Sequence, residues 1–290
     1  LWSRGLGDVY KRQSNTAVGK SALGTSSTGA QNTAVGHNSL VLSTTGNNNS
    51  AMGYGSGFNI TTGYSNVAIG AQALYTVTTA AHNVAIGNDA LKLSTADNCV
   101  AVGSLALAAN TTGAANVAMG YNAMNDNTTG AYNTAIGYAA LDVNTTADNN
   151  VAVGYGALGA NTTGTRNIAI GANALDTNVT GNNNVAIGYL SLDKTVGDDN
   201  VAVGAYSLRE NTTGVNNCAF GEQALTKNTT ADHNTAMGYY ALQQNTTGTQ
   251  NTAFGASALD ATTTSSNNTA VGYAAMTDAN GAVDSVAVGS

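Results

Sequence analysis

Apolar and polar positions recur along this chain with a fixed period. A nine-residue block such as "NTAIGYAAL" (133–141) returns seventeen times in closely related forms. The glycine of its N-x-A-x-G core falls at positions 19, 36, 53, 70, 87, 103, 120, 137, 154, 171, 188, 204, 221, 238, 255, 272 and 289. Fourteen of the sixteen intervals are seventeen residues and two are sixteen, and both short intervals lose their residue outside the block. A fixed block joined by a more variable loop, at this period, predicts a solenoid.

The pattern inside the block predicts its local structure. Counting from the Asn at position one, position three is always Ala, position four is always large and apolar, and position two is small or β-branched. This short alternation, bounded by Asn and Gly, predicts a strand, and the later "NTTG", as at 127–130, predicts a turn. Each unit should therefore be a strand, a tight bend, a second short strand and an exposed loop. The predicted fold class is an all-β parallel solenoid of seventeen coils, stacked about 4.8 Å apart.

The Asn at position one predicts a structural role. It occurs in fifteen of the seventeen copies, and Cys99 and Ser285 are the exceptions. Identical Asn side chains in successive coils can bond to one another along a stack. This ladder is predicted for Asn133, Asn150, Asn167 and Asn184.

The invariant Ala predicts a packed surface. Alternation places Ala on the face opposite the large residue at position four, and a face turned to water should vary more than this one does. We expect Ala135, Ala152, Ala169 and Ala186 to pack closely on another sheet, contributed by a second chain. The alternative is a monomeric solenoid that needs small residues in its interior.

Two exposed rows are candidates for ligand contact. Tyr follows the repeat glycine in three consecutive blocks, at Tyr121, Tyr138 and Tyr155. A stacked aromatic row suits contact with carbohydrate or protein, and simple stacking at the strand ends is the alternative. The paired Thr residues suggest an ice-binding solenoid as a rival class, although adjacent Thr residues cannot both point outward from one flat strand.

The first thirteen residues, "LWSRGLGDVYKRQ", share none of the repeat. Residues 3–13 match the translation of a widely used sequencing adaptor, so we interpret 1–13 as a non-native segment. Residues 14–290 are then a single repeat domain, which we expect to be truncated at both ends. The chain carries a net charge of −7, with 9 basic and 16 acidic residues. An acidic chain with few cations is a poor nucleic-acid binder, and no apolar run is long enough to span a bilayer.

Candidate chemistry is sparse. No paired carboxylates, metal-ligand spacing or phosphate-binding loop accompany the three histidines, and the two cysteines imply no disulfide framework. We therefore expect no enzymatic activity, no cofactor, no metal site and no membrane insertion by this segment.

The recurring "(N/S)-x-A-(I/V)-G" resembles the head-domain repeats of YadA-like trimeric autotransporter adhesins, over essentially all of residues 14–290. The resemblance implies a left-handed parallel β-roll, a homotrimer, and attachment to a host-surface protein, a glycan or a matrix protein at the outside of a bacterial cell. The units here are longer than is typical of that family because of the "NTTG" segment. Similar arrays also resemble phage-type tail fibres, which implies a virion as the alternative location. A purely structural rod is the remaining alternative.

Overall fold

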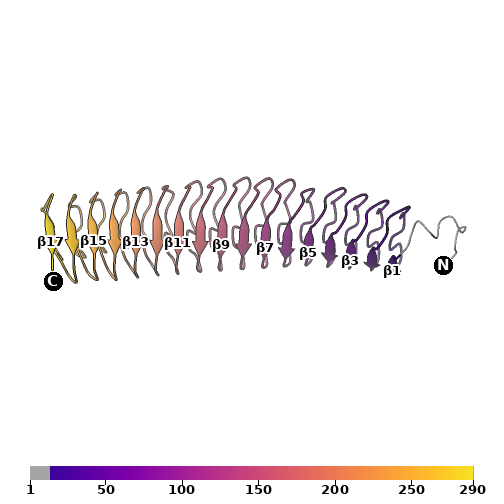
Figure 1. Cartoon of the computed structure of the whole chain (residues 1–290), viewed down its shortest axis with the longest axis horizontal. Coiled ribbons are helices and arrows are strands. Elements are labelled where there is room, and N and C mark those ends of the chain that lie inside the picture. Colours follow the sequence, from indigo (N-terminus) through magenta and orange to yellow (C-terminus); the bar gives the residue numbers. More distant parts are fainter. Residues whose placement is uncertain (1–13, 290) are drawn as a thin grey trace, which may run out of the picture. The chain divides into compact units, whose positions relative to one another are not determined.

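The computed structural model describes residues 14–289, and the segment interpreted as non-native, 1–13, lies outside them. The repeat runs through two compact units, one ending at Thr146 and the other beginning at Ala147. Each unit is a parallel β-solenoid with one three-residue strand in every coil (Figure 1). The predicted fold class is therefore confirmed, and no helix occurs among the described residues.

The first unit contains strands β1 to β8. Their bounds are β1 Thr16–Val18, β2 Thr33–Val35, β3 Ser50–Met52, β4 Val67–Ile69, β5 Val84–Ile86, β6 Val100–Val102, β7 Val117–Met119 and β8 Thr134–Ile136. The second unit contains strands β9 to β17. Their bounds are β9 Val151–Val153, β10 Ile168–Ile170, β11 Val185–Ile187, β12 Val201–Val203, β13 Cys218–Phe220, β14 Thr235–Met237, β15 Thr252–Phe254, β16 Thr269–Val271 and β17 Val286–Val288.

Neighbouring strands within a unit pair in register. Ala118 lies opposite Ala135 in the first unit, and Ala169 lies opposite Ala186 in the second. Because side chains alternate across a strand, positions two and four share one face and Ala occupies the other. The same residue type therefore stacks on itself from coil to coil.

The interior of each coil is built from small and branched side chains. In the coil that begins at Asn133, Ala135, Ala140 and Leu141 are all fully buried. Burying a Leu side chain contributes about 1.5–3 kcal/mol, and fifteen of the sixteen copies that reach position nine have Leu or Met there. Position four lies outside this core, since Ile136 is 38% exposed with its side chain pointing outward.

The expected second strand is absent from the described coils. Positions six to nine form turns, as in the segment after Gly171. Asn173 and Leu175 have φ of 51° and 55°, left-handed values that extended strand does not allow. Backbone bonds still join the coils here, because Asn173 N–H donates to Tyr155 O at 2.8 Å. The second predicted strand is therefore replaced by a turn that keeps the ladder between coils.

The repeat glycine is required by two conditions at once. Gly120 has φ of 140°, which L side chains rarely adopt. A Cβ at this position would also overlap the carbonyl oxygen of Gly137 in the next coil. Close stacking of successive coils thus depends on the glycine that closes N-x-A-x-G.

Candidate binding surfaces

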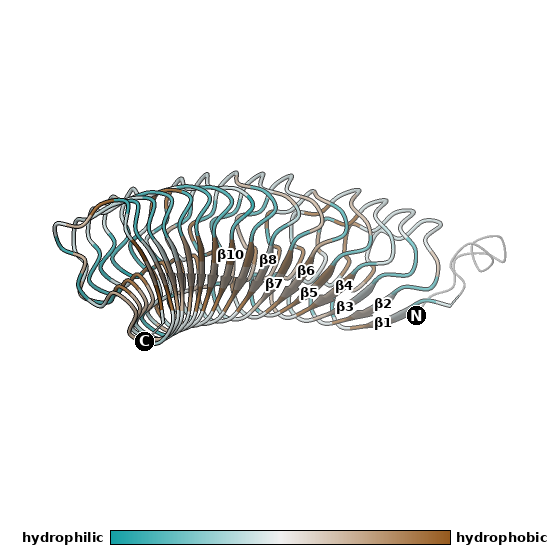
Figure 2. Ribbon diagram, turned by 60° about the vertical axis from the view of Figure 1, so that its left-hand side comes forward, coloured by the Kyte–Doolittle hydropathy of each residue, from teal (hydrophilic) through white to brown (hydrophobic). Residues whose placement is uncertain are grey.

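The outer face of the strands is the most regular exposed surface of each unit. Position four is partly exposed, with Met119 at 42% and Ile170 and Phe220 each at 38%. No charged residue occupies position two or position four in any of the seventeen copies. The strands carry white to hydrophobic colours, whereas hydrophilic colour gathers on turns away from them (Figure 2). Each unit therefore presents an uncharged, largely apolar sheet face, which we call the strand face and define as positions two and four of all its strands.

The alanines expected at a contact between chains lie elsewhere. Ala135, Ala152, Ala169 and Ala186 are fully buried within their own coils. Their small size is needed because they face the interior, where the turns of the same coil pack against the strand. They are therefore not available to a second chain, and the exposed side of each strand is the strand face.

The tyrosines after the repeat glycine are exposed. Tyr121 and Tyr138 stack in the first unit, with ring centroids 5.5 Å apart and an interplanar angle of 22°. They are 47% and 51% exposed, and Tyr155, at the same position in the second unit, is 60% exposed. Stacking of this kind follows from the repeat, because identical side chains recur at the same position of successive coils.

The Asn residues at position one are buried and bonded between coils. Asn150 Oδ1 accepts the backbone N–H of Asn167 at 2.9 Å, and Asn167 Oδ1 accepts that of Asn184 at 3.0 Å. Their amide nitrogens bond onward, since Asn167 Nδ2 donates to Gly181 O at 2.8 Å. Asn133 takes part in the same way, because its N–H donates to Asn116 Oδ1 at 2.9 Å. These bonds run mainly from side chain to backbone rather than between side chains.

A second ladder was missed because "NTTG" was interpreted only as an exposed turn. Its Asn is fully buried, and Asn127 Nδ2 donates to Asn110 Oδ1 at 2.8 Å. Asn144 Nδ2 donates to Asn127 Oδ1 at the same distance. The recurrence of Asn at position twelve in eight coils was the available signal, and the coils that lack it carry mostly small polar residues such as Ser26 and Ser94, which are also buried.

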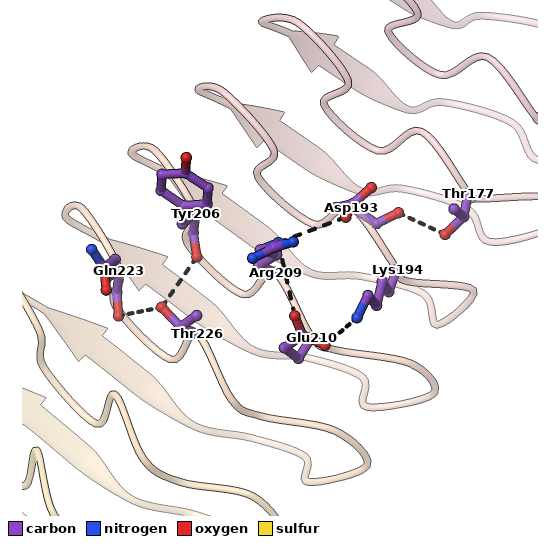
Figure 3. A network of polar contacts seen from close by, with 8 residues as sticks. All are labelled: Thr177, Asp193, Lys194, Tyr206, Arg209, Glu210, Gln223 and Thr226. Atoms are coloured by element: carbon purple, nitrogen blue, oxygen red, sulfur yellow. Dashed lines mark hydrogen bonds and ion pairs between the residues drawn. The ribbon is translucent and has the colours of Figure 1, made fainter.

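Charged side chains gather on the turns of the second unit (Figure 3). Lys194 forms an ion pair with Glu210, and Arg209 Nε lies 3.8 Å from both Asp193 Oδ2 and Glu210 Oε1. Burial raises the pKa of Asp176, and the Asp193 carboxylate raises it further. Burial also raises the pKa of Asp193, although Arg209 and Lys194 partly offset this.

Reactive and metal-binding groups are few. Cys99 is buried and Cys218 half-buried, both thiols are free, and burial raises the pKa of each. Within residues 14–289 no group of three His, Cys, Asp or Glu side chains is placed to hold a metal ion. In the same range no helix has the length and apolarity to cross a membrane.

Comparison of the chain with protein-family models, with curated proteins and with solved structures gave no significant match.

Proposed function

We propose that this chain is the head or shaft of a trimeric extracellular fibre that attaches to cell or matrix surfaces and performs no chemistry of its own. The observation that carries the proposal is the strand face, which is uncharged and partly exposed in every coil. A large uncharged surface of this kind on one chain suits contact with further copies of it. The number of copies, three, and the location outside a bacterial cell rest on the resemblance to YadA-like head repeats.

The strand face is large enough to support assembly. Position-four residues are partly exposed, as at Ile170 (38%) and Phe254 (54%). Burying the exposed part of a position-four side chain against another chain contributes roughly 0.5–1 kcal/mol to the free energy of assembly for each coil, and several kcal/mol over one unit. Since one contribution arises per coil, assembly strengthens with the length of the array.

Attachment is tested with the trimeric chain capped at both ends. Caps are needed because open strand edges aggregate and imitate adhesion. We expect the capped trimer to bind immobilised cells or matrix protein. This binding should be lost when the same matrix protein, or material released from the same cells, is added in soluble form in excess. A capped trimer that binds no cell, glycan or matrix protein would leave only a structural rod.

The gene downstream distinguishes the two kinds of fibre. Heptad repeats followed by alternating amphipathic strands would support the bacterial adhesin, because they encode a coiled-coil stalk and a membrane barrel. A chaperone domain in their place would support a phage-type tail fibre and overturn the cell-surface location.

A further inference from the structure

One stretch of the second unit differs from the rest of the array in its turn chemistry. Between Tyr189 and Gln244, turn positions six, seven, ten and eleven hold tyrosines, glutamines and charged groups, except at Leu190, Ala205 and Thr226. Three of the six basic residues outside 1–13 occur here, in three successive coils, at Lys194, Arg209 and Lys227. Every coil obeys the same packing constraints, so packing does not account for this local concentration. We call this stretch the amide–aromatic corner and define it by Tyr189, Tyr206, Arg209, Gln223, Tyr240 and Gln243.

The first part of the corner joins two aromatic rings to a guanidinium group. Tyr189 and Tyr206 meet edge to face, with centroids 5.4 Å apart and an interplanar angle of 86°. The Arg209 Cζ lies 5.6 Å from the centroid of the Tyr206 ring, at cation–π distance. Figure 3 shows Arg209 between two acidic side chains, at separations too long for hydrogen bonds. The guanidinium is therefore ion-paired with both carboxylates while it lies over the Tyr206 ring.

The second part is a chain of oriented amides. Gln243 Nε2 donates to Gln223 Oε1 at 2.8 Å, and Gln244 Nε2 donates to Gln243 Oε1 at 3.1 Å. Lys227 Nζ donates to Gln244 Oε1 at 2.7 Å and closes the chain. The Tyr240 ring stacks on Tyr239, with centroids 3.8 Å apart. These bonds fix the amide orientations, so less side-chain entropy is lost when a ligand binds.

The chemistry of the corner selects the class of ligand. Its exposed groups are rings, amides and charges, with few aliphatic side chains, so a partner that must bury apolar surface is a poor fit. The three basic residues are balanced by Asp193, Glu210 and Glu222, which disfavours a strongly charged ligand. A sugar combines apolar C–H faces that pack on tyrosine with hydroxyl groups that need donors and acceptors. A pyranose ring is also about as long as one coil step of ~4.8 Å, so successive sugars match successive coils.

We propose that the amide–aromatic corner binds a neutral glycan that runs along the stack of coils. This assignment rests on the proposed attachment function and names the class of its receptor. The rings of Tyr189 and Tyr240 pack on sugar faces, while Arg209 and Gln223 donate to the hydroxyl groups.

The test measures the mobility of the full chain in native gels that contain one soluble polysaccharide each. The neutral probes are dextran, mannan, galactan and a soluble chitin oligomer, and alginate is the anionic probe. We expect at least one neutral probe to retard the chain, and Tyr189→Ala and Arg209→Ala each to weaken that binding by about tenfold or more. The matched control, Tyr132→Ala, removes an exposed tyrosine (66%) from a coil that contains no arginine or glutamine, and should bind as the parent does. Circular dichroism melts of all three variants establish that their folds are retained.

The outcomes separate this inference from the proposed function. The glycan proposal would be overturned if alginate alone retarded the chain or if no neutral probe did. It would also be overturned if a neutral probe retarded the parent and the corner variants equally. A chain that attaches to cells while the corner variants attach equally well would also overturn it and leave the attachment function standing. A chain that binds a neutral glycan through the corner but attaches to no surface would support the corner and contradict the attachment function.

Discussion

Replacing Asn167 with alanine tests whether the position-one ladder holds neighbouring coils together. The change removes the acceptor of the Asn184 N–H, bonded at 3.0 Å, and the donor to Gly181 O, bonded at 2.8 Å. Asn167 and Asn184 are both fully buried, so water cannot replace these bonds without opening the coil. Each of the two unsatisfied buried groups costs about 1–3 kcal/mol, so the expected loss in the free energy of unfolding is roughly 2–6 kcal/mol.

Hydrogen exchange is the appropriate assay, because stability in a repeat protein is local. We expect faster exchange of backbone amides in the coils that contain residues 167–200, with coils farther away much less affected. Thr163→Ala, which truncates an exposed turn residue, is the matched control and should change exchange little. If Asn167→Ala and Thr163→Ala gave the same protection, the ladder would not be a source of stability and the reasoning would be refuted.

Three further changes give distinct expected results. Because the pKa of Asp176 is raised in the folded state, the charged carboxylate opposes folding at neutral pH, and the free energy of unfolding should rise as the pH falls from 7 toward that pKa. Asp176→Asn should raise the melting temperature at pH 7 and reduce the dependence of stability on pH. A variant with the same pH profile as the parent would contradict this expectation. Iodoacetamide should label Cys218 in isolated chains but not the buried Cys99, and non-reducing mass spectrometry should find no bridge between them; labelling of both thiols in native protein would contradict their burial. Ala152→Glu should unfold its coil because it places a charge in the core, and circular dichroism should show the loss of structure. Ile170→Glu should keep the fold and impair assembly, which light scattering should show as a smaller particle. An assembled, folded Ala152→Glu protein would be inconsistent with the interior position of that alanine.

The period of the sequence was enough to predict the parallel solenoid, its strands and their register. Residues such as Ala118 and Ala135 recur at the coil length, and identical positions must then stack. Alternation also separated the two faces of each strand. It could not say which face was interior, because the large apolar residues of position four suit a core as well as the invariant Ala does. The exposure of Ile136 and the burial of Ala135 decide that point only when the rest of the coil is in place.

The strand predicted from local sequence after the repeat glycine was wrong, because this segment forms a turn. The segment after the repeat glycine contains apolar residues with strand-like spacing, yet Leu175 takes a left-handed φ that is unusual for its type. Packing of the buried leucine and bonds between coils override that preference. The amide–aromatic corner could not be found by the period either, since it consists of departures from the repeat, and a repeat pattern describes only what the coils share.

The most direct test of the central claim is the mass of the chain in solution, measured by light scattering for the parent and for Ile170→Glu. The strand face as a contact between copies predicts a parent particle larger than one chain of 28.9 kDa, and the three copies that the resemblance implies would give three times that mass. It also predicts that the variant dissociates toward the single-chain mass while its circular dichroism is unchanged. A folded parent that scatters as a 28.9 kDa monomer, or a variant that remains as large as the parent, would contradict the assignment of the strand face to assembly.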